Sequence, residues 1–131
     1  MTRDRYVLFG VNSSFSADVC ETLRRLGCSA AAGVLTGPPE WDMQGIEVLC
    51  EEGDTGSPLL PLPVLVPWVT PSRHIDRAER AKRAGFSSFP SLVDPAAVVA
   101  SNVRLGQGVF FNAGAVIAAG LAFFISKIFG G

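Results

Sequence analysis

Apolar and polar positions along the first part of the chain alternate in blocks that predict a strand, a helix and a second strand. Residues 5–9 (RYVLF) form a short apolar run that stops at Gly10, which is typical of a buried strand. Apolar positions at helical spacing follow, and they predict a helix that Ser16 caps and Gly27 ends. Residues 30–35 form a second strand-like run. This order predicts a βαβ unit and therefore a parallel sheet.

Weaker strand patterns continue through the middle of the chain. Residues 45–50 and 64–69 both have strand-like composition, and Pro67 places the second of these at a sheet edge or at the end of its strand. Between them, residues 53–63 are rich in Gly and Pro, which predicts a surface loop.

A second helix is predicted over residues 71–84. Thr70 and the proline after it are typical of a helix start, and Gly85 is a typical end. The helix is basic, which is compatible with a phosphate-binding face. Two acidic residues, Asp76 and Glu79, precede arginines by four positions, so we expect a solvated face instead. Its basic residues are Arg73, Arg77, Arg80, Lys82 and Arg83.

From residue 93 onward the pattern changes to a period of six, which neither helices nor strands produce. The bulky positions are Val93, Val99, Leu105, Phe111 and Ile117. The residue after each is small or polar: Asp94, Ala100, Gly106, Asn112 and Ala118. A second apolar set lies four positions after the first: Ala97, Val103, Val109, Ala115 and Leu121. This pattern predicts a β-solenoid with the bulky side chains inside and the small residues at its corners.

An irregular tail and a membrane segment are the alternatives to the solenoid. Residues 109–125 carry no charge, but the stretch is just too short to cross a bilayer and contains Asn112 and two glycines. The period of six also persists through the polar unit around Arg104. We therefore favour the solenoid and expect no membrane span.

Composition excludes some classes of function. The chain has 131 residues, of which 48% are hydrophobic, so it can bury a core. Its net charge of −1 gives no global field that would hold nucleic acid. Three cysteines without a C-x-x-C pair indicate reduced, mostly buried thiols, with no disulfide framework and no metal site. Without a signal-peptide pattern, a cytoplasmic location is expected.

The βαβ pattern, the basic helix and the stretch PSLVDPAAVVASNVRLGQGVFFNAGAVIAAG together resemble the sugar acetyltransferases with left-handed β-helices, in particular the sialic-acid and bacillosamine type. The resemblance implies an α/β fold in which a small Rossmann-like parallel-sheet domain (residues 1–90) precedes a short left-handed β-helix (residues 91–120). An apolar tail (residues 121–131) would follow. It further implies a nucleotide-linked sugar as substrate, acetyl-CoA bound between the subunits of a trimer, and a β-helix histidine as general base.

Substrate-binding residues are expected at the turn after the first strand and just past the second. The family has a glycine-rich turn there, whereas this chain has GVNSSF, so hydroxyl groups would replace glycine amides as donors and Phe15 would obstruct a phosphate. We predict the following substrate-binding residues: Gly10, Asn12, Ser13, Ser14 and Thr36.

No catalytic residue is predicted. No histidine follows residue 93, His74 is expected to be solvated on its helix, and Asp94 is expected to be a turn residue. Five six-residue units make fewer than two coils, so the chain resembles a C-terminally shortened family member with an incomplete acetyl-CoA site. Three functions stay open: an acetyltransferase, a non-catalytic nucleotide-sugar-binding module, and an oligomerisation module.

Overall fold

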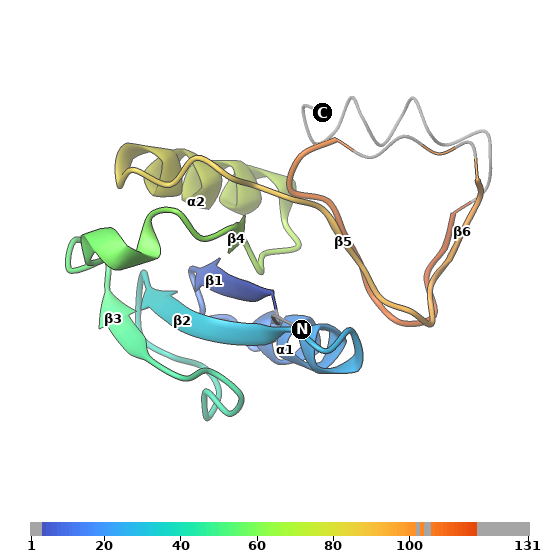
Figure 1. Cartoon of the computed structure of the whole chain (residues 1–131), viewed down its shortest axis with the longest axis horizontal. Helices are drawn as coiled ribbons and strands as arrows, with labels where there is room; N and C mark the ends of the chain where they lie inside the picture. Colours follow the sequence, from blue (N-terminus) through green and yellow to red (C-terminus); the bar gives the residue numbers. More distant parts are fainter. Residues whose placement is uncertain (1–3, 102, 104–105, 118–131) are drawn as a thin grey trace.

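A computed structural model describes residues 4–101, 103 and 106–117. Its first part is a four-stranded parallel sheet in the order β3-β2-β1-β4 (Figure 1). The strands are β1 (Arg5–Phe9), β2 (Ser29–Leu35), β3 (Leu49–Glu51) and β4 (Val64–Leu65). The βαβ unit and the parallel sheet predicted from the sequence are therefore confirmed.

Two helices cover opposite faces of this sheet: α1 (Phe15–Arg25) and α2 (Pro71–Arg83) (Figure 1). Because side chains alternate along a strand, β1 contributes to two separate cores. Val7 and Phe9 pack in the cluster that contains Ala81 of α2. Leu8 packs on the other face with Leu23 of α1. Helix α1 thus buries Val19 and Leu23 against one face of the sheet, and α2 buries Ala81 against the other.

The ends of several elements differ from the prediction. Helix α1 begins at Phe15 with Ser14 as its N-cap, so the prediction that Ser16 caps this helix is wrong. The side chain of Ser16 is fully buried, and its hydroxyl has no hydrogen-bond partner within the described residues. Helix α2 starts at Pro71 as predicted, and Gly85 follows its C-cap at φ +109°.

The two weaker strands are shorter than predicted. Within residues 45–50, the chain touches β2 at Ile46 through a single bridge and pairs continuously only from Leu49. Strand β4 ends after Leu65 because the chain reaches Pro67, which has no backbone N–H to donate. The predicted surface loop contains one short 3₁₀ helix, η1 (Ser57–Leu59).

Two further parallel strand pairs lie beyond α2: β5 (Leu92–Val93) with β7 (Phe110–Phe111), and β6 (Val98–Val99) with β8 (Val116–Ile117). In both pairs a strand lies beside the chain eighteen residues further on, which equals three of the predicted six-residue units. Figure 1 shows the two passes of the chain following one path, side by side. We call the described residues of this segment, from 92 to 117, the coil.

The interior of the coil matches the period of six. Val109 and Phe111 are buried at its centre. The other members of this cluster are Val93, Ala97, Val99, Val103 and Ala115. The described positions that the period assigns to the interior therefore pack together, while Val98 and Val116 are exposed on the outside. Residues 104–105 and 118–131, which include Leu105, Ala118 and the predicted tail, lie outside the described residues, as does the side chain of Ile117.

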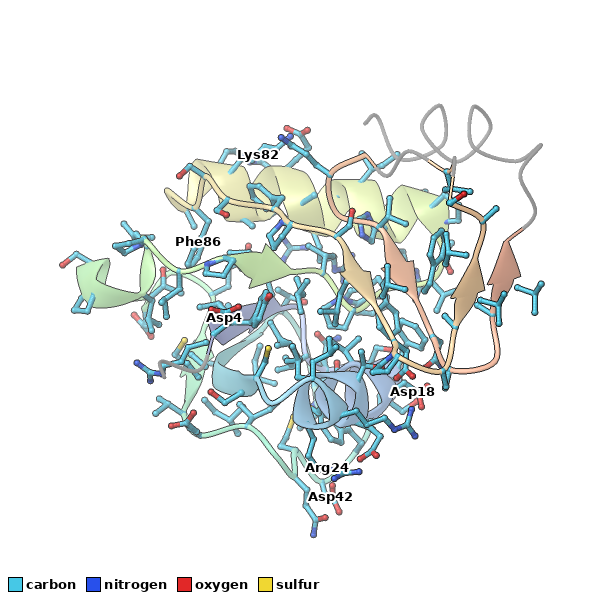
Figure 2. All side chains as sticks on the ribbon, turned by 45° about the vertical axis from the view of Figure 1, so that its right-hand side comes forward. Asp4, Asp18, Arg24, Asp42, Lys82 and Phe86 are labelled. Atoms are coloured by element: carbon cyan, nitrogen blue, oxygen red, sulfur yellow. The ribbon has the colours of Figure 1, made fainter. Side chains whose placement is uncertain are left out.

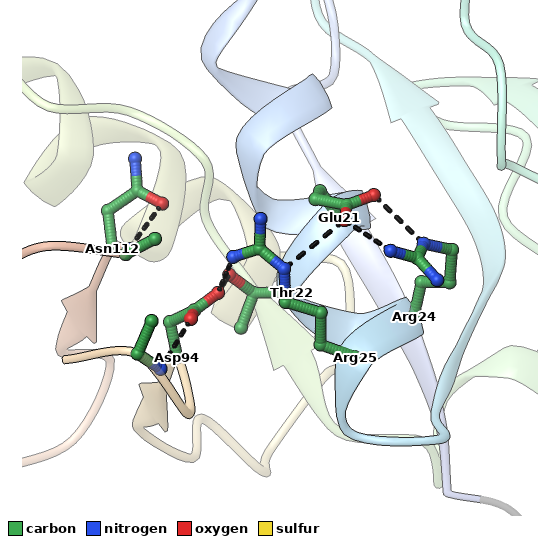
Figure 3. A network of polar contacts seen from close by, with 8 residues as sticks. Glu21, Thr22, Arg24, Arg25, Asp94 and Asn112 are labelled. Carbon is green, nitrogen blue, oxygen red and sulfur yellow. Dashed lines mark hydrogen bonds and ion pairs between the residues drawn. The ribbon is translucent and has the colours of Figure 1, made fainter.

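The coil docks on helix α1 through a buried carboxylate. Asp94 is 1% exposed and accepts hydrogen bonds from Thr22 Oγ1 (2.5 Å), Arg25 Nη1 (2.8 Å) and Ala96 N (2.8 Å) (Figure 3). The bond from Ala96 makes Asp94 the turn residue that was expected. The bonds from Thr22 and Arg25 add a second role, because they fix the coil to the sheet domain.

Candidate functional site

The turn between β1 and α1 is tightly folded against β2. Gly10 has φ +92°, and the backbone N–H groups of Gly10 and Val11 both donate to the carbonyl oxygen of Val34, at 2.8 and 3.1 Å. Ser14 N-caps α1 without a side-chain hydrogen bond and is exposed, and Phe15 N donates to Ser13 Oγ at 3.3 Å. The hydroxyl of Ser14 is therefore available to a ligand.

Asn12 and Thr36, predicted from separate parts of the sequence, are in direct contact. Thr36 Oγ1 donates to Asn12 Oδ1 at 2.8 Å. Asn12 is 7% exposed, and its backbone carbonyl oxygen accepts a hydrogen bond from Glu40 N at 2.9 Å. A Cβ at Gly37 would lie 3.2 Å from Asn12 Nδ2, so a larger residue there would crowd the amide. Asn12 thus ties the β1–α1 turn to the chain beyond β2.

Two tryptophans that the sequence analysis did not select hold the same turn. Trp68 Nε1 donates to the carbonyl oxygen of Gly10 at 2.8 Å, and Trp41 Nε1 donates to that of Val11 at 2.6 Å. A Cβ at Gly10 would lie 2.5 Å from Trp68 Nε1, so the Trp68 indole occupies the space that a side chain at this position would need. A half-buried tryptophan usually finds an acceptor for its N–H, which is the signal that could have identified both residues.

Helix α2 places arginines over Trp68. The guanidinium of Arg77 lies 4.4 Å from the centre of the Trp68 rings, and that of Arg73 lies 5.6 Å away. The side chain of Arg77 is only 17% exposed, so the prediction of a solvated basic face is wrong at this position. Further along the helix, Arg80 pairs with Glu52, and this hydrogen bond lowers the pKa of the Glu52 carboxyl.

His74 lies where α2 meets the coil. A Cβ at Gly108 would lie 3.5 Å from His74 Cε1, and the imidazole is half-buried, so the expectation of a solvated histidine is wrong. Burial lowers the pKa of His74, and a hydrogen bond with the Gly108 backbone opposes that shift. The histidine is therefore mainly neutral at neutral pH.

Residues from four segments converge at the carboxyl ends of the parallel strands. The β1–α1 turn meets Thr36 beyond β2 and Trp68 beyond β4. On the coil side, Phe15 packs edge to face against Phe110 with ring centroids 5.5 Å apart, and His74 contacts Gly108. In open α/β sheets this edge is where ligands bind. Within the described residues, no cluster of His, Cys, Asp or Glu could hold a metal ion.

A cavity of about 450 Å³ lies elsewhere, between α1 and the connection from β2 to β3. Its lining includes Cys20, Glu21, Trp41 and Gln44, and none of the predicted substrate-binding residues. Burial raises the pKa of the Cys20 thiol to about 11. Figure 2 shows Arg24 and Asp42, which also line this cavity, at the end of the molecule opposite α2.

Comparison with known proteins finds no matching family model and no matching curated sequence. Solved structures do match. One is the histidine-to-asparagine variant of perosamine N-acetyltransferase from Caulobacter crescentus in complex with CoA and GDP-perosamine. It gives a TM-score of 0.70 at 28% identity, over 91% of this chain and 56% of that chain. PerB from the same organism, also in complex with CoA and GDP-perosamine, gives the same values.

A more distant match concerns the fold alone. The acetyltransferase domain of PglB from Neisseria gonorrhoeae FA1090, in complex with acetyl coenzyme A, gives a TM-score of 0.65 at 19% identity, over 88% of this chain. This chain spans 56% of that domain and of the perosamine enzyme. No helix within the described part of the chain is long and apolar enough to cross a membrane. The resemblance inferred from the sequence is thus confirmed: the chain is similar in structure to perosamine N-acetyltransferase and spans little more than half of its length.

Proposed function

We propose that the chain binds the nucleotide-linked amino sugar that accepts an acetyl group in a sugar N-acetyltransferase reaction. The match to perosamine N-acetyltransferase in complex with GDP-perosamine and CoA, over 91% of this chain, is the observation that carries this proposal. The bound sugar would lie at the carboxyl ends of β1 and β2. Asn12, Ser13, Ser14 and Thr36 would contact it. Gly10 would shape the turn instead, because its N–H and its carbonyl oxygen are both bonded within the protein.

The geometry of the turn supports this placement. The N-terminus of α1 would present the positive end of its dipole to a phosphate, and the exposed Ser14 hydroxyl would supply a donor there. The first backbone N–H groups of the helix, from Phe15 to Ala17, already donate to Ser13 and Ser14. The hydrogen bond from Thr36 to Asn12 would hold the chain beyond β2 against the β1–α1 turn, on the other side of the bound sugar. Phe15, which was expected to obstruct a phosphate, instead packs against Phe110 of the coil.

We further propose that the coil is the beginning of a left-handed β-helix. Its eighteen-residue register and its buried interior support three short sides per coil. In a family enzyme this part would hold acetyl-CoA between the subunits of a trimer. The described coil has no Lys or Arg side chain for the phosphates of CoA, so these residues alone do not make a complete CoA site.

Acetyl transfer requires a base that reaches the sugar amine as it attacks the thioester carbonyl. Neither candidate among the described residues is suited to this role. His74 is bonded to the backbone of Gly108, and the carboxylate of Asp94 already accepts three hydrogen bonds in the contact with α1. The described residues therefore support binding and orientation of the acceptor, and binding without turnover is the second candidate function.

A ligand-binding experiment tests the proposal. We expect GDP, UDP or a GDP-linked amino sugar to raise the melting temperature, since a ligand at about 100 times its Kd stabilises a protein by about 2.7 kcal/mol. Ser14→Ala should weaken this binding without loss of stability, because Ser14 makes no side-chain cap bond. Ser87→Ala is the matched control, because Ser87 is also exposed but lies at the opposite end of the sheet. Its neighbour Ser88 accepts a hydrogen bond from Val64 N, at the amino end of β4.

Two outcomes would decide against the proposal. If none of the nucleotides raises the melting temperature, the proposed binding site does not exist. If Ser14→Ala and Ser87→Ala change nucleotide binding equally, the ligand does not bind at the β1–α1 turn. Release of CoA from acetyl-CoA in the presence of the amino sugar would show that turnover accompanies binding and would exclude the second candidate function.

A further inference from the structure

Trp68, Arg73 and Arg77 form a cluster beside the β1–α1 turn, here called the Trp68 cluster. Trp68 is fixed by its hydrogen bond to Gly10, and the two guanidinium groups lie over its rings at 4.4 Å for Arg77 and 5.6 Å for Arg73. A Cβ at Gly10 would lie 3.1 Å from Arg77 Cγ, so the stem of this arginine touches the turn itself. Its charged end is therefore within one side-chain length of the proposed nucleotide site.

Most of the side-chain N–H groups of Arg77 have no acceptor among the described residues. Its one side-chain hydrogen bond within the described residues goes from Nη1 to Asp76 Oδ2, at 3.1 Å. That carboxylate is half-exposed and also accepts from Arg80. Arg77 Nε is buried and has no hydrogen-bond partner among the residues that the structure describes. Arg80, by contrast, donates to two oxygens of Glu52 as well as to Asp76.

The charges around Arg77 favour an incoming anion. Two carboxylates lie near it: Asp76, which it contacts, and Glu52, whose pKa its charge helps to lower. Both are also paired with Arg80. Arg73 lies over the same indole, so the arginines of this group outnumber its carboxylates. Stacking on an indole holds a guanidinium flat and leaves its edge open to an acceptor. This fork matches the oxygens of a phosphate, which accept two parallel N–H bonds.

We propose that Arg77, held against Trp68, binds the phosphate groups of the nucleotide, with Arg73 as a second cation beside it. This inference rests on the proposed function for the identity of the ligand. Nucleotide sugars and CoA both contain a diphosphate, which is the chemistry that the guanidinium recognises. The contact with Gly10 assigns the site to the acceptor nucleotide, because the turn belongs to the sheet domain and not to the coil.

Isothermal titration at low ionic strength tests the inference with four probes: GDP, UDP, inorganic pyrophosphate and CoA. Arg77→Gln should weaken the binding of GDP or UDP and of pyrophosphate by about tenfold or more, since charge-assisted bidentate bonds are the strong ones. Arg77→Lys keeps the charge but loses the planar fork, and it should fall between wild type and Arg77→Gln. Arg83→Gln is the matched control, because it removes the same charge from an exposed position at the far end of α2.

The outcomes separate this inference from the proposed function. If the nucleotides bind and Arg77→Gln binds them as tightly as Arg83→Gln does, the inference is wrong and the proposed function stands. If pyrophosphate binds in an Arg77-dependent manner but no nucleotide binds, the anion site stands and the proposed function is wrong. A loss of CoA affinity that exceeds the loss of nucleotide affinity in Arg77→Gln would assign the cluster to the cofactor and overturn the inference. Absence of binding by all four probes would overturn both.

Discussion

The contact between Thr22 and Asp94 allows a quantitative test of how the coil is held against the sheet domain. Thr22→Val keeps the shape of the side chain and removes its hydroxyl, which is fully buried and donates to the Asp94 carboxylate. A hydrogen bond to a charged group contributes about 2 kcal/mol. No water can reach this position to replace it, because both side chains are buried. We therefore expect a loss of about 2 kcal/mol and, for a chain of this size, a fall in Tm of about 6 °C.

The pH dependence of this loss has a definite sign. The hydrogen bond from Thr22 is the main cause that lowers the pKa of Asp94 in the folded protein. A lowered carboxyl pKa stabilises the fold above the unfolded value, near about pH 4, and this stabilisation disappears as the pH falls through the folded pKa. The difference between wild type and Thr22→Val should thus be full at about pH 7 and shrink below about pH 4.

Urea denaturation of both proteins across this range is the assay. Thr70→Val is the matched control, since Thr70 is exposed and makes no side-chain cap bond, so its stability should stay within about 0.5 kcal/mol of wild type. The reasoning fails if Thr22→Val is as stable as Thr70→Val at neutral pH. It also fails if the loss is the same in acid, because the hydroxyl would then not be acting through the carboxylate.

Two further substitutions test the turn and the coil. Gly10→Ala should destabilise the fold by about 2 kcal/mol and shift the tryptophan fluorescence, because it combines a positive φ with a clash against Trp68. Gly53 has φ +96° with nothing within 4 Å of an added Cβ, so Gly53→Ala should lose only the stability that the positive φ costs and leave the fluorescence unchanged. If Gly10→Ala changes neither stability nor fluorescence, Trp68 does not pack on Gly10 as described. Phe111→Ala should lower the free energy of unfolding by about 3 kcal/mol and the exposed Val98→Ala by about 0.5 kcal/mol or less, whereas equal losses in chemical denaturation would refute the buried interior of the coil.

The period of six was the most informative sequence signal, because it depends on short-range geometry. Each unit places one bulky side chain inside, so a repeat read directly from the sequence identified Val93, Val99 and Phe111 as interior residues. The same reasoning separated strands from helices in the sheet domain. It was weakest at element ends, where Ser16 was expected as a cap and is instead buried one residue inside α1.

Contacts between distant segments could not be predicted in this way. His74 and Arg77 appear solvated if α2 is considered alone, because four-residue spacing describes only neighbours on the same helix. Their burial comes from Gly108, 34 positions beyond His74, and from Trp68 beyond β4. Asp94 was assigned correctly as a turn residue, but its bonds to Thr22 and Arg25 span 72 and 69 positions and have no local signature.

The two tryptophans explain how this chain forms the turn with a single glycine where its resemblance implies several. Glycines in such a turn allow backbone amides to approach a phosphate, but they leave the turn flexible. Here the indole N–H groups of Trp41 and Trp68 bond two successive carbonyl oxygens, at Val11 and Gly10, and so fix the backbone from outside. The same arrangement fills the open side of Gly10 with an indole, so that side cannot receive a phosphate. The cation that lies on this indole, Arg77, is then the group placed to take over the phosphate contact that the missing glycines would have made.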